Sequence, residues 1–245
     1  MRGFSKIVAL ATIAAVTLSP TRAFSLSFGL DPLSNSLTLI GSGPANVFQP
    51  GFPLPGPGPL PPPGIGFTTA ELGLLPGDVI DALSYGEDGG AGTIYFTVSR
   101  GSVGAAGPLT PDVASEVAGV PPLVQPEASS DIFSTFDPAG VPPGFNSQVL
   151  DGDGLAPLAP LTVYPGFGFG LSELNPLPGP PFNDQIADFD WALNGRGRLF
   201  GVFFSLAAGS PSLTPGANPL RPAGAEPGDL LFAFPGPPPF FGLGV

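Results

Sequence analysis

The chain contains no cysteine and no histidine, and its only lysine is Lys6. Disulfides are therefore excluded, as are zinc or copper sites built from imidazole or thiolate groups. A Ser-His-Asp triad and a Cys-His pair cannot be assembled. Beyond residue 6 the chain also lacks the lysine that a Schiff base, a Ser-Lys dyad or a P-loop requires. These absences remove most enzyme classes and predict a protein that is not an enzyme.

Positive charge is scarce as well. Seven basic residues stand against 19 acidic ones, which gives a formal net charge of −12 at pH 7. Three of the seven lie within the first 22 residues, and the rest of the chain holds only Arg100, Arg196, Arg198 and Arg221. So few cations cannot neutralise a phosphate backbone or an anionic lipid surface, so no nucleic-acid partner is expected. Cations are the more natural ligands.

The N-terminus has the layout of a secretory signal. Arg2 and Lys6 precede an uncharged run from Ile7 to Leu18, and small residues flank Arg22 at the point where a signal peptidase would cut. The run is shorter than the ~20 apolar residues that a membrane-spanning helix needs. We therefore expect a cleaved signal helix over 1–23, no transmembrane segment after cleavage, and a secreted or cell-envelope location, in the periplasm or at the cell surface.

Helix-forming stretches are rare because 37 glycines and 36 prolines interrupt the chain. Short apolar or alternating runs bounded by Gly, Pro, Asn and Asp are common instead, which is typical of strands. They span Ser25–Leu30, Val79–Leu83, Thr93–Val98, Asp131–Phe136, Phe200–Leu206 and Asp229–Phe234. The sequence thus predicts an all-β fold of short antiparallel strands with long Pro/Gly-rich loops. A β-sandwich or an open barrel is favoured, with a propeller-like fold as the alternative.

Three sequence patterns recur in the same order. The Phe-Ser pattern has a Phe, an aliphatic residue two later and a Ser six after the Phe, and it occurs at Phe28–Ser34, Phe96–Ser102 and Phe204–Ser210. After each copy comes a closing pattern, at Asn46-Val47-Phe48, Asp131-Ile132-Phe133 and Asp229-Leu230-Leu231. Two copies are also preceded by an opening pattern, Asp78–Leu83 and Asp184–Phe189, with Glu71-Leu72 and Glu173-Leu174 upstream. An ordered series of this kind indicates internal repeats that bury a core by packing on one another.

The repeats and the proline-rich stretches suggest a division of the chain. We expect a signal peptide over 1–23, a partial β unit over 24–48, a Pro-rich linker or strap over 49–70, a full unit over 71–150, a loop over 151–172, a second full unit over 173–234 and a Pro-rich tail over 235–245.

These patterns resemble repeats in uncharacterised exported bacterial proteins. The shared features are the Asp-Ala-Leu segment, the Phe-Ser-x-x-x-Gly-Ser type of strand ending and the Asp-Ile-Phe segment, and they cover most of the range from Glu71 to Phe234. The resemblance implies β architecture and an envelope or secreted setting. It implies no activity.

Carboxylates are the remaining groups that could do chemistry. Paired acids can hydrolyse glycosides, and Asp81, Asp188, Asp190 and Glu173 are the candidates. Trp191, Tyr85, Tyr95 and Tyr164 could stack on a sugar ring, although core packing is the simpler use of an aromatic residue. Asp81 and Asp188 are expected to recur at matching places in the two full units. We therefore favour structural roles for them, at turns and strand edges.

Asp151-Gly152-Asp153-Gly154 begins like a calcium loop. Leu155 stands where a further oxygen ligand would be needed, and no bidentate Glu follows, so an EF-hand is excluded. A looser Ca²⁺ site using Asp151, Asp153 and backbone carbonyls stays open, beside the plain interpretation as an Asp-Gly turn.

The leading hypothesis is an exported, non-catalytic structural or interaction protein that needs no cofactor. The alternative is a calcium-assisted extracellular module that binds glycans or surface polymers, and a carboxylate-dependent glycosidase comes third. A protein or a glycan is the expected kind of partner.

Overall fold

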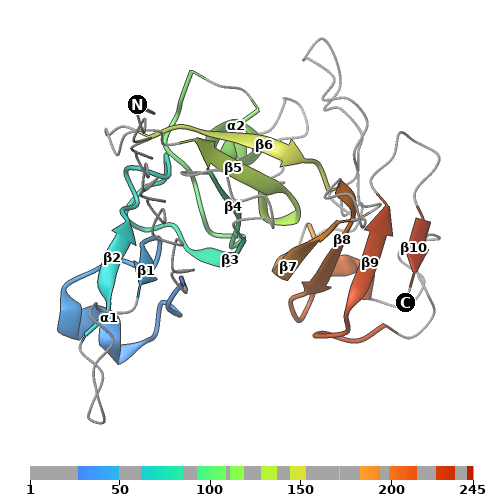
Figure 1. Cartoon of the computed structure of the whole chain (residues 1–245), viewed down its shortest axis with the longest axis horizontal. Helices are drawn as coiled ribbons and strands as arrows, with labels where there is room; N and C mark the ends of the chain where they lie inside the picture. Colours follow the sequence, from blue (N-terminus) through green and yellow to red (C-terminus); the bar gives the residue numbers. More distant parts are fainter. Residues whose placement is uncertain are drawn as a thin grey trace, which may run out of the picture.

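The computed structural model describes residues 27–49, 62–84, 93–108, 111–118, 128–136, 144–152, 171, 183–193, 199–213, 225–234 and 242–244. Most of the regular secondary structure in these residues is antiparallel strand, so the all-β prediction is confirmed (Figure 1). The predicted signal peptide lies outside the described residues.

The strands form three antiparallel sheets. The first sheet pairs β1 (Val47–Gln49) with β2 (Gly64–Phe67). The middle sheet has the order β3 (Ile80–Ser84), β4 (Thr93–Val98), β5 (Ile132–Phe136) and β6 (Asn146–Leu150). The last sheet has the order β7 (Ile186–Leu193), β8 (Leu199–Leu206), β9 (Leu231–Phe234) and β10 (Gly242–Gly244). Both large sheets are meanders, in which each strand pairs with the next one along the chain.

Helical structure in the described residues is short. Helix α1 (Asn35–Ile40) begins at Ser34, whose Oγ accepts a hydrogen bond from Ser36, and ends at Gly41, where φ is +64°. Helix α2 (Val113–Ala118) follows Asp112, whose side chain accepts a hydrogen bond from the backbone N–H of Ser115. Two 3₁₀ turns span Ala128–Ser130 and Pro211–Leu213. Helix α2 and the two 3₁₀ turns lie between consecutive strands, and the small helical share fits the low helix content predicted from the prolines and glycines.

Two strands lie in ranges predicted to lack regular structure. β2 lies in the predicted linker over 49–70, and β10 lies in the predicted tail over 235–245. Conversely, the predicted strand at Ser25–Leu30 contributes only a bridge between Phe28 and Phe48 in the part that the structure describes. Cross-strand pairing explains these differences: a Gly-rich segment can join a sheet when a neighbouring strand satisfies its backbone groups.

The recurring patterns take the same register in all three sheets. The Phe of the Phe-Ser pattern lies directly across from the third residue of the closing pattern, in the pairs Phe28–Phe48, Phe96–Phe133 and Phe204–Leu231. The last residue of each opening pattern lies across from the same Phe, in the pairs Leu83–Phe96 and Phe189–Phe204. Because neighbouring residues point to opposite faces of a strand, this register brings the aromatic side chains to one face of each sheet, which we call the front face.

The opening patterns also begin alike. Asp78 and Asp184 are both buried. Asp78 accepts hydrogen bonds from the backbone N–H groups of Val103 and Gly104, at 2.7 and 3.0 Å, and Asp184 accepts one from Ser212 at 2.8 Å. The pattern serine completes the arrangement, since the Oγ atoms of Ser102 and Ser210 each accept from the residue after the Asp, at 3.1 Å. The Ser six residues after each Phe thus ties the end of one strand to the start of its neighbour.

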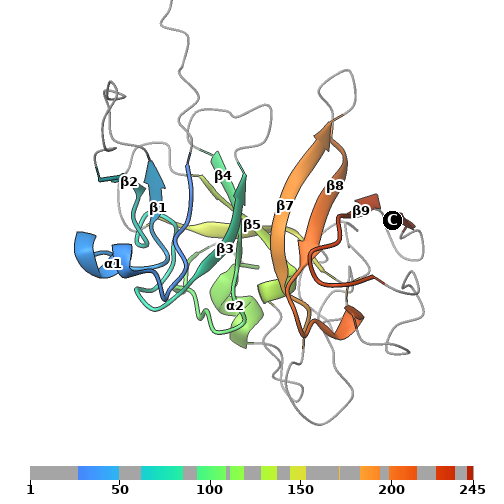
Figure 2. The ribbon, with the colours of Figure 1, turned by 90° about the horizontal axis from the view of Figure 1, so that it is seen from below.

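The sheets pack front to back through two apolar clusters. The front face of the middle sheet, with Phe96 and Phe133, packs on Val47 from the opposite or back face of the first sheet. The front face of the last sheet, with Phe204 and Leu231, packs on Ile132 from the back face of the middle sheet. Strands β3 and β7 are in contact, and Figure 2 shows them side by side. The core therefore lies between the sheets, so each interface depends on residues from two of them.

Candidate functional site

Polar side chains gather where the middle and last sheets meet near β3 and β7. We call this group the polar seam, and it consists of Asp81, Thr97, Arg100, Ser129, Asn183, Asp184, Gln185 and Ser210. Its members come from both sides of the interface. The seam is the site in the described residues where charged groups are brought together from distant parts of the sequence.

Asp81 occupies a bulge in β3. The register between β3 and β4 shifts between Ile80 and Ala82, so Asp81 has no direct partner across the strand pair. Its carboxylate accepts a hydrogen bond from the side-chain amide of Gln185, the residue before β7. The bulge thus turns an acidic side chain toward the last sheet.

Thr97 lies at the same bulge. Its hydroxyl accepts a hydrogen bond from the backbone N–H of Ala82 at 3.1 Å and donates one to the carbonyl oxygen of Ile186 at 3.2 Å. One buried side chain therefore satisfies the backbone that the bulge leaves unpaired in the middle sheet and also holds the last sheet.

Arg100 reaches across the seam from the turn after β4. Its Nε donates to the carbonyl oxygen of Asn183 and its terminal nitrogen donates to the Oγ of Ser210, both at 3.1 Å. Burial lowers the pKa of the guanidinium, and the nearby charges of Asp184 and Asp81 oppose that shift. The guanidinium thus places its positive charge between two carboxylates while bonding neutral oxygens of the opposite sheet.

Ser129 provides a second contact from the middle unit. Its hydroxyl donates to the carbonyl oxygen of Asp184 at 2.6 Å and accepts from the side-chain amide of Asn183 at 2.8 Å. Ser129, Asn183 and Asp184 are all buried. Because buried polar groups are costly when unpaired, these bonds favour one relative placement of the two sheets.

The electrostatics of the seam are most evident at Asp81. Burial raises the pKa of its carboxyl group from 3.8 to about 6, while the hydrogen bond from Gln185 and the charge of Arg100 act in the opposite direction. A carboxyl group with such a pKa can gain or lose a proton under mildly acidic conditions. Its described hydrogen bond goes to the neighbouring sheet, so the titration acts on the interface between the two sheets.

The structure separates the predicted glycosidase candidates. Asp188 and Asp190 are exposed on the back face of β7, where Asp190 accepts a hydrogen bond from Ser84 at 3.3 Å. Asp81 instead lies in the seam, and Glu173 lies outside the described residues. Sequence reasoning thus identified Asp81 but missed its partners.

The expectation that Asp81 and Asp188 occupy matching places is wrong. Asp188 pairs with Ser205 as Ala82 pairs with Thr97, so Asp188 corresponds to Ala82. The bulge residue that corresponds to Asp81 is Ala187. The residues that do recur are Asp78 and Asp184, which have the same structural role in the two sheets.

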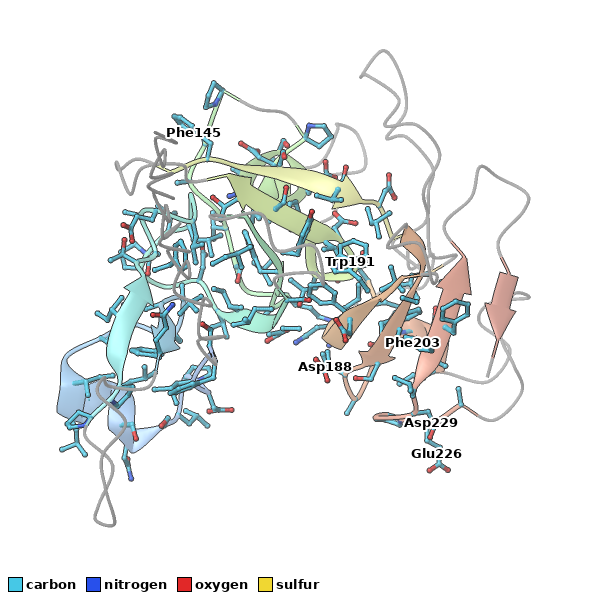
Figure 3. The ribbon with its side chains drawn as sticks, viewed as in Figure 1. Phe145, Asp188, Trp191, Phe203, Glu226 and Asp229 are labelled. Atoms are coloured by element: carbon cyan, nitrogen blue, oxygen red, sulfur yellow. The ribbon has the colours of Figure 1, made fainter. Side chains whose placement is uncertain are left out.

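Of the four aromatic residues considered for sugar stacking, the structure describes two, Trp191 and Tyr95. Trp191 is buried, and its ring meets that of Tyr95 edge to face with 4.9 Å between the ring centroids. Figure 3 shows Trp191 between the two large sheets, so its ring fills the core and is not available to a sugar. Tyr85 and Tyr164 lie outside the described residues.

Asp151 follows β6 directly, and the neighbouring Gly152 donates its backbone N–H to Asp131 at 2.9 Å. Asp153 lies outside the described residues, so the calcium site stays a prediction. In the part of the chain that the structure describes, no group of three or more acidic side chains is arranged to hold a metal ion. In that same part, no helix is long and apolar enough to cross a membrane.

A scan of known protein families found no family model that matches this chain, and searches of curated proteins and of solved structures found no match either.

Proposed function

We propose that this chain is an exported, non-catalytic structural or interaction protein, built from β units that stack like the blades of an open propeller. The observation that carries the proposal is the common register of the three patterns. The same Phe position faces the same closing-pattern position in each sheet, and β3 and β7 have their bulges at the same place. An incomplete first unit and two full units account for this arrangement.

The uses of the polar residues favour a structural role. Asp78 and Asp184 bind backbone N–H groups, while Asp81, Arg100 and Thr97 form bonds across the seam. Each of these groups is explained by the need to pair buried polar atoms. Asp188 and Asp190 lie on the opposite side of the last sheet from its core, and exposed acids there keep a sheet surface soluble.

Expression with the native N-terminus in a secreting host tests the proposal. The purified product should begin at Phe24, as mass spectrometry would show, and it should leave a panel of β- and α-linked glycans intact. Hydrolysis that Asp81→Asn or Asp188→Asn abolishes would establish the glycosidase alternative instead. Retention of residues 1–23 in a cytoplasmic product would overturn the exported location.

Calcium distinguishes the second candidate, a glycan- or polymer-binding module. That candidate is favoured by the acid excess and by the position of Asp151 at the end of β6. For the structural protein, the melting temperature measured by circular dichroism should be the same in millimolar Ca²⁺ and in EDTA. A melting temperature that is higher in Ca²⁺ than in EDTA would support the binding module, provided that Asp151→Ala removes the difference and Asp229→Ala retains it.

A further inference from the structure

In the first and middle sheets, the back face is covered by the next sheet. The back face of the last sheet has equivalent positions, but they are exposed. The second residue of the closing pattern points to the back face in each unit. Val47 and Ile132 are both 0% exposed there, because the next sheet packs over them. The equivalent residue in the last sheet is Leu230, which is 65% exposed.

A second position shows the same contrast. Tyr95 precedes the pattern Phe of the middle sheet and packs on the last sheet through Trp191. Its equivalent is Phe203, which precedes Phe204 and is 40% exposed. Phe203 packs on Phe232 with 4.7 Å between ring centroids, and Figure 3 shows it over β8 and β9, on the side of the last sheet away from Trp191. The last sheet thus presents an apolar back surface formed by Phe203, Leu230 and Phe232.

The front face of the first sheet is partly open at the other end of the stack. Ile65 lies across from Phe48 on this face and is 50% exposed. Phe28 lies across from Phe48 on its other side and is half-buried. In Figure 1 the first and last sheets lie at opposite ends of the molecule, with the middle sheet between them. The stack therefore has a partly exposed front face at one end, where Ile65 and Phe28 flank the fully buried Phe48, and an exposed back face at the other.

We infer that a second copy of this chain docks head to tail on the back face of the last sheet, and that the copy contributes the front face of its own first sheet. This contact repeats the front-to-back packing by which Ile132 and Val47 are covered within one chain. The inference rests on the stacked-unit proposal above and names the partner that such a stack would take. A contact of two different faces leaves each face open at the next copy, so it builds chains or rings.

The charges disfavour the symmetric alternative, in which two last sheets pair back to back. Asp188 and Asp190 are exposed on the back face of β7, and Glu226 and Asp229 are exposed in the turn before β9. A twofold axis through this surface would set these acids against their own copies, and like charges brought together oppose association. In the head-to-tail contact, the back face meets Ile65 and Phe28 of the first sheet, so these acids do not face their own copies.

Because the chain has no cysteine, engineered cysteines test the contact directly. Leu230→Cys and Ile65→Cys are made in separate full-length chains, mixed in equal amounts and oxidised. A disulfide-linked dimer should form in the mixture and be nearly absent when either variant is oxidised alone. The control is Val103→Cys, which is also exposed but lies on the turn after β4, mixed with Leu230→Cys.

Two results would overturn the inference. One is a Leu230→Cys dimer in the absence of Ile65→Cys, which would show back-to-back pairing. The other is a mixture that yields no more dimer than the Val103→Cys control.

Sedimentation of the unmodified protein gives an independent measure. Its mean mass should rise with concentration, and Phe203→Asp should weaken association by about tenfold or more, since the contact would bury an unpaired carboxylate. A mass that stays at one chain at all concentrations would contradict head-to-tail docking, while the absence of hydrolase activity would still support the structural proposal. Circular dichroism of the variant checks that it is folded.

Discussion

At the scale of single residues, Asp78 combines deep burial with several strong hydrogen bonds. Its two oxygens accept from three backbone N–H groups, those of Leu75, Val103 and Gly104. Asp78→Ala leaves these donors unpaired in a buried turn. We expect it to lower the free energy of unfolding by about 3 kcal/mol, as measured by urea denaturation.

Asp229 provides the matched control. It accepts one backbone N–H, from Glu226 at 2.9 Å, and is exposed, so water can replace the lost bond. Asp229→Ala should cost less than about 1 kcal/mol. Equal losses for the two variants would show that the buried bonds of Asp78 add nothing beyond those of a surface turn.

The raised pKa of Asp81 predicts that the stability of the protein depends on pH. Its pKa is raised to about 6 in the folded chain, whereas an ordinary Asp titrates near 3.8, so the folded state binds this proton more tightly than the unfolded state. Its contribution to stability is therefore greatest below pH 4, falls as the pH rises through 6, and amounts to a penalty of at most about 3 kcal/mol at pH 7.

Asp81→Asn removes that titration and keeps an oxygen that can accept from Gln185. The stability of the variant relative to the wild type should rise between pH 4 and pH 7, and urea denaturation at each pH measures the difference. Taking the difference cancels the other acids to first order. A value that is constant across this range would show that the raised pKa has no effect on folding.

At the scale of elements, β8 has a buried and an exposed Phe side by side. Phe204 is fully buried between the sheets, and Phe203 lies on the opposite face. Phe204→Ala should destabilise the protein by about 3–5 kcal/mol, because it leaves a cavity in the core. Phe203→Ala should cost less than about 1 kcal/mol in dilute solution. Chemical denaturation of both variants tests the assignment of faces, and the reverse order would mean that the register of β8 is wrong.

Strands β3, β4, β5, β8 and β9 were predictable because their signals are local, whereas the predicted runs did not include β6 or β7. Alternation around Phe96 and Phe204 indicates a strand face whatever the chain pairs with. The serine six residues later also recurs visibly, but its bond to Val79 or Gln185 joins residues 23 or 25 apart. The sequence could therefore reveal the recurrence without the reason for it.

The polar seam could not be predicted in the same way. Asp81 meets Gln185 across a separation of 104 residues, and Arg100 meets Asn183 across 83. No local pattern encodes such contacts, since they depend on how one sheet packs on another. The mismatch between Asp81 and Asp188 has a different cause and was visible in the sequence, because the fourth residue of the opening pattern is Asp81 in one copy and Ala187 in the other.

At the scale of the whole molecule, shared cores should make the middle and last sheets unfold together. Ile132 and Leu150 of one sheet lie in the same cluster as Phe204 and Trp191 of the other. Trp191 is the only tryptophan, so its fluorescence reports on this interface. In a urea titration, its transition should coincide with the loss of the β signal in circular dichroism. A fluorescence change well before the loss of β structure would mean that the sheets separate first.

Arg100 has a consequence for the exterior of the protein. It is the only basic residue in the part of the chain that the structure describes, and its guanidinium is bonded within the seam. The described surface therefore presents acids, such as Asp188, Asp190 and Glu226, without neighbouring cations of its own. Such a surface gathers mobile counterions from the medium, so the ionic strength of the surrounding solution would set how closely two molecules can approach.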